Sequence, residues 1–270
     1  MTLRSGLPLW VLGVMILAIA VFADRVPAQN DKAGALFGKP LELKLEGTTK
    51  RLFRGYYRQR PGEDFGTESF YPIGWSKEGK FGYYVEPVDE ACGCYFAKLF
   101  ILDLKTDKVL WQFNYESESL EEEKKAGRPY SLNTLWQANR KLFSDKLREN
   151  DIAPQERFNL LEFPINHKGD LLTAHLETKE KEDAGAEARL YGIVNSVTLQ
   201  LSSKRNGKKT ILDQPYLEVL PLYVGVVGYV KSPFEPRIAV ILMEIHRGYE
   251  GPPHVGEVKI VGASLEAGFK

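Results

Sequence analysis

Short runs of β-branched, aromatic and aliphatic residues, separated by turn residues, fill most of this 270-residue chain and constrain its fold more than any other feature. Such runs favour extended backbone, and the Gly, Pro, Asn and Asp residues between them favour turns. The pattern predicts a mainly β protein built of antiparallel sheets. We expect strands at residues 41–45, 52–58, 71–76, 81–86, 96–104, 109–115, 160–165, 171–177, 189–201, 210–212, 217–231, 238–245 and 257–262.

A helical insertion at residues 117–149 interrupts the strands. Residues 117–126 run from acidic to basic, an order that suits the dipole of a short helix, and Gly127 follows as a stop. Apolar residues then recur at three- and four-residue spacing between Ser131 and Glu149. This spacing predicts an amphipathic helix that packs one face on the sheets.

Residues 1–23 have the layout of a secretory signal peptide. Arg4 supplies a positive charge, residues 7–22 form an uncharged apolar run, and small residues at 21–23 or 26–28 offer a processing site. An uncleaved run of this length could instead act as a single membrane anchor, but Gly13 and the lack of a basic stop favour cleavage. We expect a periplasmic or secreted protein with no membrane span after cleavage.

Composition and charge limit the domain organisation and the partners that we expect for the mature chain. We expect residues 24–39 to be a flexible leader and residues 40–270 to form a single β-rich domain, long enough to bury a core. Removing the signal peptide leaves 35 basic and 36 acidic residues. The resulting net charge gives no long-range attraction to nucleic acid or anionic membranes, so we expect no nucleic-acid partner.

Both cysteines of the chain, Cys92 and Cys94, lie in one tetrapeptide. In an oxidising compartment such a pair can close into a tight disulfide, remain as two thiols or bind a soft metal. A metal would need a further ligand from a distant residue. We therefore rank a disulfide that staples the loop first, metal binding second and thiol-redox catalysis third.

Three segments share a strand–turn–strand layout followed by a further strand: residues 73–85, 163–174 and 228–240. The first turn, residues 75–80, reads Trp-Ser-Lys-Glu-Gly-Lys. The first and third units resemble blades of TolB-type β-propellers, in which a Trp-Ser-Pro-Asp-Gly-Lys-like turn precedes a strand.

More broadly, the layout from Tyr71 onward, including residues 247–253 and the closing residues 261–263, is similar to a family of bacterial predicted secreted proteins of unknown function. This resemblance implies export and a β architecture, and it brings no catalytic residue.

The spacing of the three units departs from the propeller pattern. Their turns, at Ser76, Asn166 and Ser232, are 90 and 66 residues apart, whereas a propeller needs at least four regular blades. Either a degenerate blade lies in residues 40–65, or the units form an irregular multi-sheet domain.

The sequence carries no nucleophile elbow, no His-Glu-x-x-His motif and no phosphate-binding glycine loop. His246, Glu250 and His254 are spaced by four, which on a helix would place them on one face as metal ligands. The glycines and prolines between residues 248 and 253 forbid that helix. We therefore expect an ordinary loop there, keep the three residues as a weak metal candidate, and expect no cofactor.

One stretch combines basic and aromatic residues, and its candidates for a ligand or partner surface are Arg51, Arg54, Tyr56, Tyr57 and Arg58. Such a composition can bind single-stranded nucleic acid. Because we expect export, an anionic envelope polymer or an acidic protein is the better expectation. The interpretation that we favour over both is a strand with one charged face and no binding role.

These observations favour a non-catalytic exported protein that binds an envelope protein or polymer through loops at the ends of its sheets. One alternative is an exported enzyme, either a thiol-redox protein that uses Cys92 and Cys94 or an unrecognised hydrolase. Another is a structural component of the envelope without a ligand. The sequence leaves the oligomeric state open.

Overall fold

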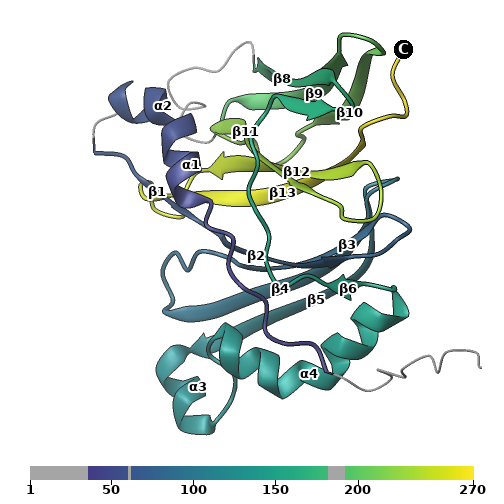
Figure 1. Cartoon of the computed structure of the whole chain (residues 1–270). Helices are drawn as coiled ribbons and strands as arrows, with labels where there is room; N and C mark the ends of the chain where they lie inside the picture. Colours follow the sequence, from purple (N-terminus) through teal and green to yellow (C-terminus); the bar gives the residue numbers. More distant parts are fainter. Residues whose placement is uncertain (1–35, 60–61, 182–191) are drawn as a thin grey trace, which may run out of the picture. The chain divides into compact units, whose positions relative to one another are not determined.

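A computed structural model describes residues 36–59, 62–181 and 192–270, and residues 36–270 form one compact unit (Figure 1). Strands dominate this unit, which confirms the mainly β fold with antiparallel sheets and a helical insertion. The predicted signal peptide and leader residues 24–35 lie outside the described residues. No described helix combines the length and apolar character that a membrane span requires.

The described strands form three sheets. Sheet 1 has the order β5-β4-β3-β2-β6 and contains β2 (Ser69–Trp75), β3 (Lys80–Glu86), β4 (Cys94–Asp103), β5 (Lys108–Ser119) and β6 (Ala153–Pro154). Sheet 2 contains, in spatial order, β10 (Gly207–Pro215), β9 (Val194–Ser203), β8 (Asp170–Glu180) and β7 (Ile165–His167). Sheet 3 contains β1 (Phe65–Thr67), β13 (His254–Ser264), β12 (Arg237–His246) and β11 (Tyr223–Lys231), also in spatial order. The strand pairs are antiparallel except β1 with β13.

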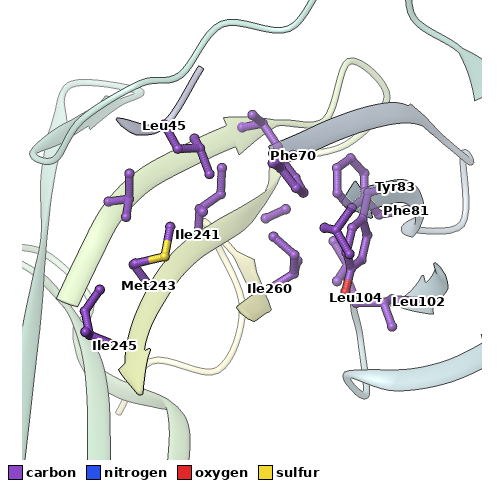
Figure 2. Packing of buried hydrophobic residues seen from close by; sticks show 14 of the residues in the cluster. Leu45, Phe70, Phe81, Tyr83, Leu102, Leu104, Ile241, Met243, Ile245 and Ile260 are labelled. Carbon is purple, nitrogen blue, oxygen red and sulfur yellow. The ribbon is translucent and has the colours of Figure 1, made fainter. Parts of the chain in front are cut away.

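Sheet 3 lies between the other two sheets (Figure 1) and is buried on both faces. Successive side chains of a strand point to opposite faces. Toward sheet 1, β12 presents Ala239, Ile241, Met243 and Ile245, which belong to the cluster in Figure 2. Toward sheet 2 it presents Ile238, Val240 and Leu242. This two-sided burial explains the uninterrupted apolar run at residues 238–243.

The predicted helix at 131–149 is confirmed as α4 (Leu132–Glu149), which covers the other face of sheet 1. Ser131 and Thr134 form a capping box at its start. Its buried residues Leu135, Trp136, Phe143 and Leu147 pack against sheet 1. The amphipathic spacing in the sequence therefore identifies the helix face correctly.

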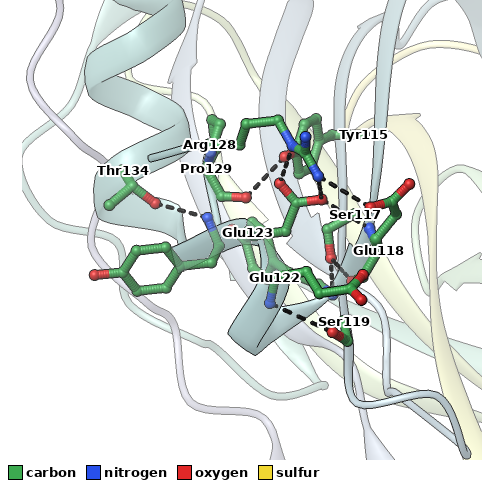
Figure 3. A network of polar contacts seen from close by, with 11 residues as sticks. Tyr115, Ser117, Glu118, Ser119, Glu122, Glu123, Arg128, Pro129 and Thr134 are labelled. Carbon is green, nitrogen blue, oxygen red and sulfur yellow. Dashed lines mark hydrogen bonds and ion pairs between the residues drawn. The ribbon is translucent and has the colours of Figure 1, made fainter. Parts of the chain in front are cut away.

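The short acidic-to-basic helix is confirmed as α3 (Leu120–Ala126), which ends at Gly127 in the left-handed conformation. It begins later than predicted because β5 continues to Ser119. The buried Glu123 accepts hydrogen bonds from Arg128, at 2.6 Å from its Nε, and from the backbone N–H of Glu118 at 2.9 Å (Figure 3). This network fixes α3 to the end of β5.

The predicted strand at 52–58 is wrong, because this stretch forms the end of α1 (Glu46–Leu52) and α2 (Arg54–Gln59). Phe53 and Tyr56 are both buried and both pack on Tyr223 of β11. A spacing of three places two side chains on the same side of a helical turn but on opposite faces of a strand. Their shared burial therefore requires helical backbone.

Several predicted strand bounds also need correction. Residues 41–45 form no strand, although Leu43 donates a backbone hydrogen bond to Phe70. Only residue 165 of the predicted strand 160–165 belongs to a strand, and the predicted strand 217–231 begins at Tyr223, after Pro221. Proline lacks the N–H that a sheet ladder needs. Residues 189–191 of the predicted strand 189–201 lie outside the described residues.

The three strand–turn–strand units are confirmed as the hairpins β2–β3, β7–β8 and β11–β12, and each belongs to a different sheet. In sheet 1 the strands β2 to β5 are neighbours in sequence order, and in sheet 2 the strands β7 to β10 are. Residues 40–65 contain α1 and α2 instead of a degenerate blade. The multi-sheet alternative therefore describes this fold.

The turn between β4 and β5 joins sheet 1 to sheet 3. Arg237 Nη1 donates a hydrogen bond to the carbonyl oxygen of Leu104 at 2.7 Å, and the backbone N–H of Gly262 donates to Asp107 at 2.7 Å. A Cβ atom at Gly262 would collide with the Leu104 backbone. The glycine thus permits the close approach of the two sheets.

We predict that Gly262→Ala lowers the free energy of unfolding by about 1–3 kcal/mol, because the added methyl group forces two backbones apart. Denaturant unfolding measures the change. Gly38→Ala is the matched control, since its added Cβ would meet nothing within 4 Å. Equal stability of the two variants would contradict the close packing of sheet 1 on sheet 3.

A buried carboxyl group lies beside sheet 3. Glu68 follows β1, is only 6% exposed, and accepts a hydrogen bond from the backbone N–H of Val258 at 2.9 Å. Burial raises the pKa of Glu68 to about 7, and this effect exceeds the opposing effect of the Val258 hydrogen bond. The folded state therefore binds a proton that the unfolded state releases at a lower pH.

Because the folded pKa lies above the unfolded one, ionisation of Glu68 costs stability as pH rises from about 4.5 to 7. Glu68→Gln keeps an acceptor for Val258 and removes this cost. We predict that the variant gains stability relative to wild type over this pH range, by up to about 3 kcal/mol. Unfolding curves at pH 4 and pH 8 measure the gain, and a stability difference independent of pH would refute it.

Candidate functional site

The two cysteines lie in the loop between β3 and β4, residues 87–93, and at the start of β4. Cys92 and Cys94 are a close pair joined as a disulfide, the first of the three states expected from the sequence. The Asp89 carboxylate accepts hydrogen bonds from the backbone N–H groups of Ala91 at 3.3 Å and Cys92 at 3.1 Å. These bonds fold the disulfide loop into a tight turn at one end of sheet 1.

A second loop, residues 247–253 between β12 and β13, reaches the disulfide loop. The Glu90 carboxylate accepts a hydrogen bond from the backbone N–H of Tyr249, although 159 residues separate them in sequence. A Cβ atom at Gly248 would collide with the carbonyl oxygen of Pro253, so glycine allows this loop to fold back on itself. The two loops that stand out in the sequence therefore meet.

These loops and the ends of β4 and β5 form a pocket of about 530 Å³. Phe96 on β4 lies opposite Glu116 on β5, and Lys98 lies opposite Asn114. Directly opposed residues share a face of the sheet, so these four side chains form the floor. The two loops add mostly apolar walls, which include Pro87, Val88, Ala91 and Tyr249.

The pocket has a negative rim. Among its described lining residues, Asp89, Glu90 and Glu116 carry carboxylates and Lys98 carries an ammonium group. Lys98 is close enough to Glu68 to oppose the rise in the pKa of that carboxyl. Within the described part of the chain, the side chain of Glu116 makes no hydrogen bond or ion pair.

The structure does not bring His246, Glu250 and His254 together. His246 Nε2 lies 3.6 Å from a carboxylate oxygen of Glu244. His254 is buried, with Nε2 at 3.3 Å from Glu63 and Nδ1 accepting the backbone N–H of Gly248 at 3.4 Å. Across residues 36–59, 62–181 and 192–270, no three His, Cys, Asp or Glu side chains gather as metal ligands.

The basic and aromatic candidates have different environments. Arg51 pairs with Glu162, and both line a second pocket of about 490 Å³ between α1, β8 and β11. Arg54 and Arg58 are exposed on α2, whereas Tyr56 is buried in the core and donates a hydrogen bond to Glu63. The side chain of Tyr57 lies outside the described residues. Tyr56 therefore faces the core and is not available to a partner.

Sequence reasoning missed the pocket floor and the role of Tyr249. Phe96, Lys98 and Glu116 are ordinary strand residues in the sequence, and only their register places them on one face. The Cys-Gly-Cys and Gly-Pro-Pro segments did mark the two loops, but nothing local indicates that these loops touch.

Comparisons with known proteins identify no relative of this chain. The chain matches no protein-family model, no curated protein and no solved structure. The geometry of the site is therefore the basis for proposing a function.

Proposed function

We propose that this chain is an exported, non-catalytic binding protein and that the pocket beside the disulfide loop holds the apolar part of its ligand. Export rests on the signal-peptide layout of residues 1–23. Binding rests on one observation, an open and mostly apolar pocket at the end of sheet 1, lined by Phe96 of the floor and by the apolar loop walls.

The position of the pocket supports this proposal. Lys98 is paired with Val85, so the floor belongs to the face of sheet 1 that carries Val85 and packs on sheet 3 elsewhere. At the pocket this face is open to solvent, and the side chain of Phe96 is only partly buried. Exposed apolar surface of this kind marks binding sites in soluble proteins.

The size of the pocket also fits ligand binding. Small-molecule sites typically have volumes of roughly 300–1,000 Å³, mostly apolar walls and a few polar groups that set orientation. The pocket beside the disulfide loop has about 530 Å³. Asp89, Glu90, Lys98 and Glu116 supply its polar groups.

We predict that n-octyl glucoside, an uncharged ligand with an apolar chain, binds this pocket with a Kd of the order of 1 mM or tighter. Two-dimensional amide NMR below the critical micelle concentration should show saturable shifts at residues 87–98, 114–116 and 249. Phe96→Ser should weaken binding several-fold because it removes apolar floor. Phe234→Ser is the control, since Phe234 is 43% exposed on the β11–β12 turn and does not line this pocket.

Unsaturable shifts, or shifts spread evenly over the surface, would overturn the proposed binding function. So would equal affinities for wild type and Phe96→Ser. Circular dichroism of each variant checks that the fold is retained.

A second candidate function is thiol-disulfide exchange, because Cys92 is exposed at the rim of the pocket. In that reaction a dithiol partner would be oxidised to a disulfide while Cys92 and Cys94 are reduced to thiols. The first proposal predicts that the double variant Cys92→Ser, Cys94→Ser keeps octyl glucoside affinity within about threefold, because the strands supply the pocket floor. Loss of binding in this variant, together with rapid exchange by wild type, would favour the redox candidate.

A further inference from the structure

We infer that the ligand of this pocket is a small organic cation, an apolar body that carries an ammonium group. This inference rests on the proposed binding function and adds the chemical class of the ligand. Its basis is the combination of an apolar cavity, exposed carboxylates and aromatic side chains in one site.

The carboxylates give the pocket its charge preference. Asp89, Glu90 and Glu116 are all exposed, and they come from the disulfide loop on one side and from β5 on the other. A cation in the pocket would therefore have negative charge on two sides. Field lines concentrate in a cleft with low-dielectric walls, which strengthens this attraction over that of a flat acidic surface.

Glu116 is the carboxylate best placed to bind the cation directly. It lies opposite Phe96 in the register of β4 and β5, so its side chain is part of the floor beside that ring. Asp89 and Glu90 already accept backbone hydrogen bonds from the two loops. Glu116 has no such contact with the described chain, so its full charge is available to a ligand.

Two aromatic residues add a second attraction for a cation. Phe96 belongs to the floor, and Tyr249, which is 77% exposed, belongs to the wall. The faces of aromatic rings attract ammonium groups by about 0.5–2 kcal/mol, and sites for quaternary ammonium ligands commonly use this attraction. An anionic head group would not gain this attraction, because the ring faces are negative.

Lys98 is the one positive charge among the described lining residues and would favour an anion instead. Its ammonium group is near the carboxyl of Glu68, which is almost fully buried beside sheet 3. Above pH 7, where Glu68 is ionised, it offsets part of the charge of Lys98. The carboxylates at the opening face solvent and determine which charge the site prefers.

The test compares three ligands with the same octyl chain: octyltrimethylammonium, octyl sulfate and octyl glucoside, each below its critical micelle concentration. We expect octyltrimethylammonium to bind at least about tenfold more tightly than octyl sulfate at low ionic strength. Added sodium chloride should reduce this ratio, since the attraction is partly electrostatic. Chemical shifts of residues 87–98, 114–116 and 249 report the site.

A matched pair of variants tests whether the carboxylate of Glu116 causes the preference for a cation. Glu116→Gln should reduce the ratio of the octyltrimethylammonium and octyl sulfate affinities several-fold, with a smaller change in the affinity for octyl glucoside, which has no charge to meet the carboxylate. Glu121→Gln removes an exposed carboxylate on α3, outside the pocket, and should change neither value. Because Glu116 is exposed, its substitution leaves the core intact.

The outcomes separate the two proposals. If octyl glucoside binds at the pocket but octyl sulfate binds as tightly as octyltrimethylammonium or more tightly, the cation inference fails and the binding function stands. If none of the three ligands gives saturable shifts at the pocket, both fail. An unchanged affinity ratio in Glu116→Gln would also overturn the role assigned to that carboxylate.

Discussion

Burial of sheet 3 on both faces is the constraint on which the rest of the structure depends. Its strand β12 is apolar on both sides, so water must be excluded from both faces by other layers. Sheet 1 and sheet 2 provide these layers, and the amphipathic helix α4 covers the remaining apolar face of sheet 1. The close approach at Gly262 and the hydrogen bond from Arg237 to Leu104 are local consequences of this stacking.

The pocket follows from a mismatch between strand lengths in sheet 1. β3 pairs only with residues 98–103 of β4, whereas β4 begins at Cys94 and β5 extends alongside to Ser119. The ends of β4 and β5 therefore project past β3. The disulfide loop folds over this projection and the loop carrying Tyr249 reaches it from sheet 3, and the pocket lies between these loops and the strand ends.

Much of the fold could be predicted from local patterns. The errors in the predicted strands arise where contacts between residues distant in sequence decide the structure. Hairpin turns and the capped helix α4 depend on residues close in sequence, so their positions were correct. Phe53 and Tyr56 look like strand residues by composition, but their contacts with Tyr223 of β11 require a helix. The pairing of Cys92 with Cys94 was predictable because the residues are adjacent, whereas the pocket beside them was not.

By itself the sequence determined the secondary structure of most segments and the tight loop around the cysteines. These properties depend on side-chain type, spacing and turn chemistry within a few residues. Only the tertiary structure decided that the hairpins form three stacked layers, that His246 and His254 have separate carboxylate partners, and that Tyr249 lies beside the disulfide loop. Those outcomes depend on contacts between residues up to 191 positions apart, for which no local pattern carries information.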